Sequence, residues 1–162
     1  MVELKQKSKH QLLGEILICR HVITSQQLEV ALALQKVREG FLGERLVELG
    51  YAREEEVVMA LVIQCHLPYI AVDQYEINEE ILELIPADMA RGYHVIPLDR
   101  VGDVLTVVME NPLNGFQKEE LKRITHCQIA PFISTKMSIE KAMHRWYGDA
   151  VSQGEENRYG DI

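Results

Sequence analysis

The chain contains an internal repeat that limits what its N-terminal third can fold into. Residues 12–35 read LLGEILICRHVITSQQLEVALALQ, and residues 41–64 read FLGERLVELGYAREEEVVMALVIQ. Gly14 and Gly43 hold the same place in the two copies, 29 residues apart, and Gln35 and Gln64 close them. Repeats of about this length usually encode one supersecondary unit each. We therefore expect two copies of one small motif.

The apolar residues of each copy follow helical spacing. Leu28, Leu32 and Gln35 fall at positions i, i+4 and i+7, and residues 24–27 (TSQQ) have the form of a helix-capping box. Gly50 stands where a helix end favours left-handed backbone, and His21 is its counterpart in the first copy. We predict that each copy is an αα-hairpin and that residues 1–66 form a four-helix unit.

The remainder of the chain has a mixed helix and strand pattern. Residues 76–93 predict two short helices separated by Pro86, which cannot donate a hydrogen bond inside a helix. Residues 94–98 and 104–109 predict a β-hairpin, residues 115–125 a helix, residues 127–133 a third strand, and residues 134–148 a capped final helix. We predict an α+β chain in which residues 67–148 form a small α/β unit with a mostly antiparallel three-stranded sheet. Residues 149–162 are polar and predict a tail or linker.

Composition and motifs exclude several classes of function. The net charge of −8 argues against a nucleic-acid polymer as partner, because such binding relies on clustered lysine and arginine. No apolar run reaches the ~18 residues of a membrane span. No phosphate-binding loop, dinucleotide fingerprint or zinc-protease motif occurs, so we expect no catalytic residues and no enzyme. Three widely spaced cysteines are typical of reduced thiols in the cytoplasm.

Neighbouring cysteine and histidine residues raise the question of a metal site. Cys19 with His21, Cys65 with His66, and His126 with Cys127 are the candidate pairs. Adjacent side chains on a helix or strand point apart, and none of the pairs has zinc-knuckle spacing. We therefore predict buried structural cysteines, surface histidines and no bound metal.

The repeated glycine and glutamine point to a shared surface. Glycine in a helix costs about 0.5–1 kcal/mol relative to alanine, so a glycine kept in both copies indicates a close approach by a neighbouring helix or by a ligand. Gly14 and Gly43 are predicted near helix N-termini, where free N–H groups favour an anion. Gln35 and Gln64 add an amide at the end of each apolar face. The alternative is that the leucines are ordinary core and that the repeat reflects duplication alone.

The two motifs together resemble the MshEN domain, the N-terminal domain of type II secretion and type IV pilus extension ATPases. Each copy carries leucine–glycine, a leucine three residues after that glycine, and a later pair of apolar residues followed by glutamine. Residues 67–86, 94–98 and 105–114, and a closing helix ending in RWYG, follow in the family's order. The resemblance covers roughly residues 10–148.

The resemblance implies a ligand, partners and a location. In the family the motif pair cradles cyclic di-GMP, with leucines against its apolar surfaces and polar groups holding guanine and phosphate. The implied partners are a secretion or pilus ATPase core domain and the cytoplasmic part of an inner-membrane platform protein. The implied location is cytoplasmic and peripheral to the inner membrane, with no cofactor required. The candidate cyclic di-GMP residues are Leu13, Gly14, Leu17, Leu28, Leu32, Gln35, Leu42, Gly43, Leu46, Gly50, Val57, Leu61 and Gln64.

The chain departs from the family where the motif places arginine before leucine–glycine. Leu12 and Phe41 occupy these positions, and neither can pair with phosphate. Nearby cations that could substitute are Lys9, His10, Arg38 and Arg45. His21 stands where the first motif has glycine, and Asn111-Pro112 replaces a frequent Asp-Pro. We therefore expect first a non-catalytic regulatory and docking domain that mediates protein–protein interaction, and as the alternative a cyclic di-GMP sensor.

Overall fold

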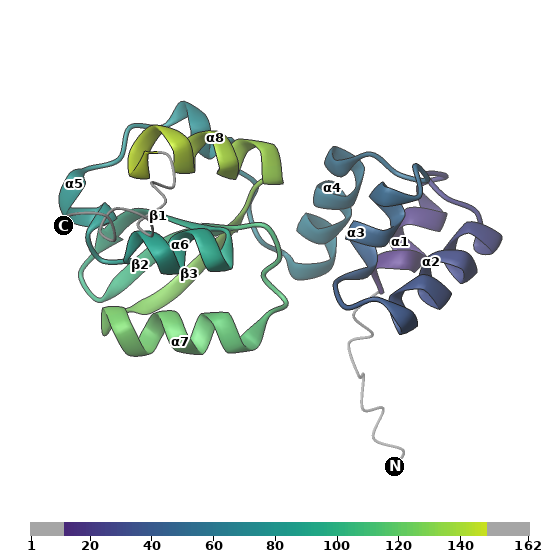
Figure 1. Cartoon of the computed structure of the whole chain (residues 1–162), viewed down its shortest axis with the longest axis horizontal. Helices are drawn as coiled ribbons and strands as arrows, with labels where there is room; N and C mark the ends of the chain where they lie inside the picture. The colour runs from purple at the N-terminus through teal and green to yellow at the C-terminus, as the bar shows by residue number, and fades with distance from the viewer. Residues whose placement is uncertain (1–11, 149–162) are drawn as a thin grey trace, which may run out of the picture.

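The N-terminal repeat folds into four helices in the computed structural model, which describes residues 12–148 (Figure 1). The helices are α1 (Leu13–Cys19), α2 (Ser25–Val37), α3 (Leu42–Glu48) and α4 (Glu54–Cys65). We call these four the helical unit. Each copy of the repeat forms one helical hairpin, as predicted. The predicted tail at residues 149–162 lies outside the described residues, as do Lys9 and His10.

The four helices begin in the same way. In each, a glutamate or glutamine at the third helical position accepts a hydrogen bond from the backbone N–H of the residue before the helix: Glu15 from Leu12, Gln27 from Thr24, Glu44 from Phe41 and Glu56 from Arg53. Only α2 adds the reciprocal bond, because the Thr24 hydroxyl accepts from the N–H of Gln27. The predicted capping box of residues 24–27 is confirmed.

The left-handed helix ends also match expectation. His21 (φ 58°) and Gly50 (φ 70°) both adopt the left-handed region after α1 and α3. Three further histidines, His66, His94 and His126, occupy the same region after α4, α6 and α7. Histidine is one of the residues that tolerates this conformation better than β-branched side chains do.

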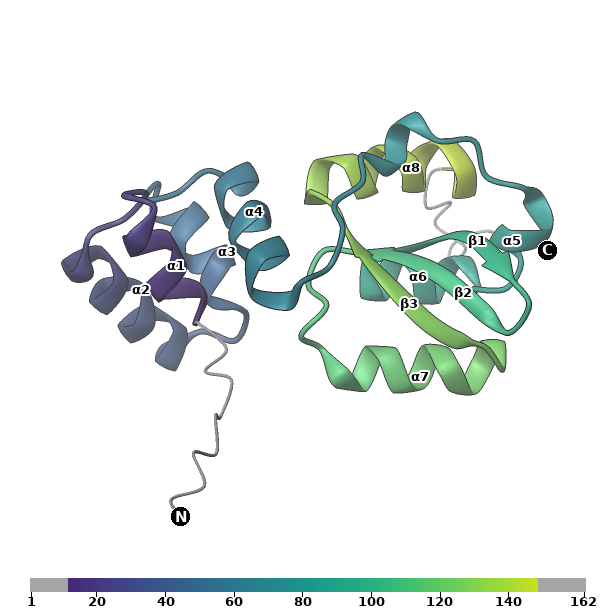
Figure 2. The same cartoon turned by 180° about the vertical axis from the view of Figure 1, so that it is seen from behind.

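The second part of the chain wraps helices around a three-stranded sheet. It comprises η1 (Val72–Gln74), α5 (Glu79–Leu82), α6 (Ala87–Tyr93), β1 (Val95–Val101), β2 (Val104–Met109), α7 (Gly115–Thr125), β3 (Gln128–Ile133) and α8 (Lys136–Tyr147). We call this the sheet unit. Helix α8 covers one side of the sheet and α7 lies on the other (Figures 1 and 2). The α+β class is confirmed, and Pro86 separates α5 from α6 as predicted.

The strand directions correct one detail of the prediction. Strand order is β1-β2-β3, with β1 and β2 antiparallel but β2 and β3 parallel, so the sheet is mixed rather than mostly antiparallel. Helix α7 is the reason, because a crossover helix returns the chain to the starting end of the sheet. Pro97 and Pro131 lie on the two edge strands, where a missing N–H is tolerated.

Two clusters of buried side chains meet at the end of β3. One centres on Leu17 and Leu46 in the helical unit, and the other on Ile96, Leu105 and the rest of the sheet unit. Ile133 is fully buried and belongs to the helical cluster although it ends β3. Its N–H and C=O bond to the connecting segment, through the C=O of Pro68 and the N–H of Ile70. The predicted boundaries at residues 66 and 148 stay predictions.

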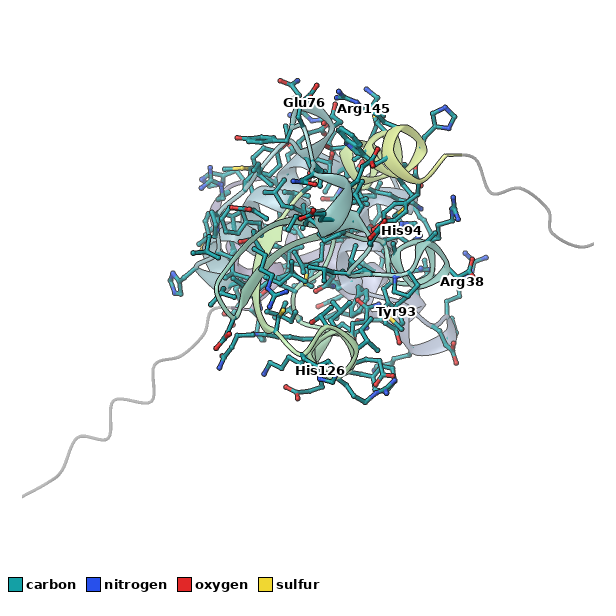
Figure 3. All side chains as sticks on the ribbon, turned by 90° about the vertical axis from the view of Figure 1, so that its left-hand side faces the viewer. Arg38, Glu76, Tyr93, His94, His126 and Arg145 are labelled. Carbon is teal, nitrogen blue, oxygen red and sulfur yellow. The ribbon has the colours of Figure 1, made fainter. Side chains whose placement is uncertain are left out.

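Polar contacts fix the outer helices of the sheet unit. Arg145 of α8 donates to a carboxylate oxygen of Glu76 at 2.9 Å, and Figure 3 shows the two side chains next to each other. The hydroxyl of Tyr147 donates to the C=O of Leu82 at 3.0 Å and lies 3.2 Å from that of Ile85. Burial raises the pKa of Tyr147 to about 12. The final helix is thereby held against the α5 segment.

Candidate functional site

A groove of about 730 Å³ runs between the helical unit and the sheet unit. Its volume is within the range of about 300–1,000 Å³ that small-molecule sites occupy. One wall comes from α1 to α4 and the other from the end of α6, the segment after β2, α7 and the start of α8. The lining residues are Leu12, Leu13, Gly14, Leu32, Gln35, Phe41, Leu42, Gly43, Glu44, Arg45, Val47, Glu48, Glu54, Val57, Val58, Leu61, Gln64, Gly92, Tyr93, His94, Glu110, Asn111, Leu113, Gln117 and Lys136.

Most of the candidate motif residues reach this groove. Those that line it are Leu13, Gly14, Leu32, Gln35, Leu42, Gly43, Val57, Leu61 and Gln64. Four others do not. Leu17 and Leu46 are fully buried in the helical core, Leu28 packs against that core, and Gly50 lies exposed at the end of α3. The two copies therefore direct their glycines and glutamines to one shared face.

Helix packing accounts for both motif glycines. A Cβ atom on Gly14 would lie 2.7 Å from Leu28 Cδ1, and one on Gly43 would lie 2.5 Å from Val57 Cγ1. Leu28 and Val57 are equivalent positions of the repeat, 29 residues apart. In both hairpins the missing side chain thus makes room for the same residue of the following helix. The sequence left two explanations for these glycines, a close approach by a neighbouring helix or by a ligand. In the structure, side chains of the neighbouring helix approach both glycines closely.

The two glutamines differ in what they bind. Gln35 Nε2 donates to the C=O of Gly40 at 3.2 Å and ties α2 to the segment before α3. Gln64 Oε1 is buried and has no hydrogen-bond partner among the described residues. A buried amide oxygen without a partner loses the hydration it would have in water. Of the two, Gln64 is therefore the one with unused capacity to bind a ligand.

Acidic side chains outnumber basic ones in the groove. Glu44, Glu48, Glu54 and Glu110 line it, against Arg45 and Lys136. The Glu110 carboxylate is 4.0 Å from His94 Nδ1. Burial raises the pKa of Glu110, the proximity of His94 and Lys136 lowers it, and Glu44 and Glu54 raise it further. Binding of a polyanionic ligand in this groove therefore requires cations that neutralise the negative charge of the ligand.

Arg45 is the buried cation of the site. Only 9% of its side chain is exposed, and its Nη1 and Nη2 atoms contact Glu48 at 3.0 Å and Glu44 at 3.2 Å. Arg38, a second substitute considered from sequence, does not line the groove; it is 62% exposed and lies 3.6 Å from Glu48. The positions that replace the motif arginines, Leu12 and Phe41, are 63% and 38% exposed and form part of an apolar rim.

Sequence reasoning did not include the wall formed by the sheet unit. The local sequence patterns in this wall indicate only where helices and strands end, and they give no sign of a binding site. The residues concerned are Tyr93, His94, Glu110 and Gln117. One contact between the two walls also joins residues far apart in the sequence. A Glu54 carboxylate oxygen accepts a hydrogen bond from the N–H of Lys136 at the start of α8. The Asn111-Pro112 dipeptide, which interrupts a strand pattern, was the one local signal near this wall.

Within residues 12–148, no group of three or more His, Cys, Asp or Glu side chains is placed to hold a metal ion. Nor does this range contain a helix long and apolar enough to cross a bilayer.

Known proteins with similar sequences indicate the family of this chain. The MshEN domain family matches residues 65–153, which is more than half of the chain. The type IV pilus assembly ATPase PilB of Myxococcus xanthus is 31% identical over 137 residues, covering 85% of this chain and 24% of PilB. The Thermus thermophilus PilB is 29% identical, and bacteriophage adsorption protein B of Escherichia coli 28%. The chain spans about a quarter or less of these relatives' lengths.

Solved structures with the same fold accompany these sequence matches. The structure of MshE with cdg is 27% identical, has a TM-score of 0.75, and is matched over 85% of this chain and 99% of that chain. The N-terminal domain of XpsE has a TM-score of 0.73 at 17% identity, over 84% and 94% of the two chains, which shows the fold alone. The family match begins at Cys65, after both repeats. From the matched range and these relatives, the chain belongs to the MshEN domain family.

Proposed function

We propose that the chain is a non-catalytic regulatory and docking domain of a type IV pilus assembly or type II secretion ATPase. The observation that carries the proposal is its 31% identity with Myxococcus xanthus PilB over 137 residues, within a family match that covers more than half of the chain. Similar regions also occur in a protein named for bacteriophage adsorption, which supports a module rather than a catalytic core. Its place is cytoplasmic, held at the inner membrane through partners.

The docking proposal is tested by co-purification. The tagged chain is mixed with the cytoplasmic part of the inner-membrane platform protein from the same organism, and separately with the matching ATPase core. We expect retention of at least one of them in buffered physiological salt, and no ATP hydrolysis by the chain alone. A folded chain that retains neither partner would contradict docking. A chain that hydrolyses ATP by itself would contradict a non-catalytic role.

A cyclic di-GMP sensor is the second candidate. Its support is the 27% identity with MshE, whose structure is with cdg, an abbreviation of cyclic di-GMP. Gln35, Gln64 and both motif glycines line one groove of suitable volume, which is the arrangement that binding across both repeats requires. The missing motif arginines and the acidic lining oppose it. Their loss removes charge-assisted contacts of about 1.5–3 kcal/mol each.

Calorimetric titration with cyclic di-GMP decides the sensor proposal. At a ligand concentration of 100 times Kd, binding adds about 2.7 kcal/mol to the free energy of unfolding, so a thermal shift should accompany the heat. Cyclic di-AMP is the matched control, since it carries the same charge without guanine. Gln64→Ala should weaken binding because the Gln64 amide oxygen is buried and has no partner among the described residues. Absence of heat and of a thermal shift at about 100 µM ligand contradicts a sensor of useful affinity.

A further inference from the structure

The two copies of the repeat differ in one buried position. Arg45 follows Gly43 by two residues, and its counterpart in the first copy is Ile16, which is 3% exposed in the helical core. The second copy thus buries a guanidinium where the first buries a hydrocarbon. Burying an ion is unfavourable unless it is well paired, and an apolar side chain of similar volume is often equally stable. Packing alone therefore gives no reason for an arginine at this place.

The pairing of Arg45 leaves part of its binding capacity unused. Nη1 contacts Glu48 Oε2 at 3.0 Å and Nη2 contacts Glu44 Oε2 at 3.2 Å, but Nε is buried and has no partner among the described residues. The Nε–H and one Nη–H of a guanidinium form a side-on fork that matches two oxygens of a phosphate. One of these two donors is already free, and the other is held only by Glu44.

Glu44 can release Arg45 without losing its own place. The same Oε2 atom accepts a hydrogen bond from the N–H of Phe41 at 3.1 Å, where it caps α3. Glu44 is exposed, so water can solvate the carboxylate once the guanidinium leaves. The Glu44–Arg45 pair packs directly against Gly40, because a Cβ on this glycine would clash with Glu44 Oε2 and lie 2.8 Å from Arg45 Nη2.

We propose that Arg45 is the phosphate-binding cation of the groove and takes the place of the two absent motif arginines. Its guanidinium exchanges the carboxylate of Glu44 for a phosphate of a cyclic dinucleotide, while Glu48 continues to hold Nη1. The inference rests on the proposed sensor function and names the residue on which phosphate affinity depends.

The test compares three variants with the unmodified chain in calorimetric titrations with cyclic di-GMP. Arg45→Met should weaken binding at least tenfold, because a charge-assisted bond contributes about 1.5–3 kcal/mol. Arg38→Met is the matched control: it removes the same charge from a side chain that is 62% exposed and projects from the periphery in Figure 3. We expect less than a threefold change for it.

Glu44→Gln gives a result of the opposite sign. Glutamine can keep the cap, as Gln27 does for α2, but no longer competes as a carboxylate for Arg45. Affinity should therefore rise about two- to fivefold, the range of a partly exposed ion pair. This variant also keeps the proposal testable if Arg45→Met fails to fold.

The outcomes distinguish the sensor function of the chain from the phosphate-binding role of Arg45. If the unmodified chain does not bind cyclic di-GMP, the sensor function is wrong and the role of Arg45 is wrong with it. If the chain binds but folded Arg45→Met binds equally well, or Glu44→Gln does not bind more tightly, the sensor function stands and the assignment of Arg45 is overturned. Tenfold loss in the first variant with gain in the second supports both.

Discussion

The packing of the repeats predicts that adding a side chain at either motif glycine will destabilise the protein. A Cβ added to Gly43 would lie 2.5 Å from Val57 Cγ1, well short of the 3.4–4 Å of ordinary contact. Val57 is buried and belongs to the helical core, and a β-branched side chain on a helix has essentially one rotamer. The Gly43→Ala variant must therefore separate α3 from α4 rather than rotate a methyl group aside.

The expected magnitude follows from two opposing effects. Overpacking a core costs about 1–3 kcal/mol, and the stiffness of Val57 places this site in the upper half of that range. Alanine regains up to about 1 kcal/mol of helix propensity. The free energy of unfolding should thus fall by about 1–2 kcal/mol. Gly14→Ala should lose less, because the atoms it approaches are the terminal methyls of Leu28, which can rotate.

Urea unfolding of the whole chain, followed by circular dichroism at 222 nm, measures these changes. Gly92→Ala is the matched control, since a Cβ there meets nothing within 4 Å and should stabilise α6 by about 0.5–1 kcal/mol. Adding Val57→Ala to Gly43→Ala should recover at least about 1 kcal/mol in a double-mutant cycle. A Gly43→Ala protein as stable as the unmodified chain, without such coupling, would refute the packing explanation.

Three further predictions concern single groups in the structure. Because burial raises the pKa of Tyr147 to about 12 from an ordinary 10, the folded chain holds this proton more tightly than the unfolded one, and stability should fall between pH 10 and about 12. Tyr147→Phe should remove this dependence in thermal melts; an unchanged profile would contradict it. Burial likewise raises the pKa of Glu110, so its ionisation opposes folding as pH rises above the ordinary value of 4.5. Glu110→Gln should therefore raise Tm at pH 7 relative to the unmodified chain but much less at pH 4, and an equal effect at both would refute it. Glu54→Ala removes the carboxylate that accepts from the N–H of Lys136, and should speed hydrogen exchange of that amide; unchanged exchange would show that the contact does not join the two units.

Local sequence signals predicted most of the secondary structure correctly. The helix predicted at residues 115–125 is α7 (Gly115–Thr125), and the hairpin expected from residues 94–109 is β1 and β2. Pro86, the capping box after Thr24 and the left-handed His21 all act within a few residues of the chain. Such features depend on backbone sterics and near-neighbour hydrogen bonds, which the sequence records directly.

These local signals do not predict the direction in which β3 pairs with β2. An apolar run indicates that a strand is buried, but its pairing with β2 is parallel because α7 carries the chain back across the sheet. The apolar pattern of Gln128–Ile133 would be the same for either direction. Similarly, periodicity assigned Leu17 and Leu46 to the apolar face without telling a groove floor from the centre of a core, where both are fully buried.

Repeat period, helix caps and apolar spacing act over short distances along the chain, and they were enough to predict a doubled helical hairpin followed by an α/β unit. The three-dimensional packing was needed to show that Gly14 and Gly43 accommodate the following helix, that Glu110 and Lys136 face the motifs across a groove, and that Arg45 is buried between two glutamates. These relations join residues brought together by packing of separate elements, and that packing depends on the summed contacts of the whole chain rather than on any local pattern.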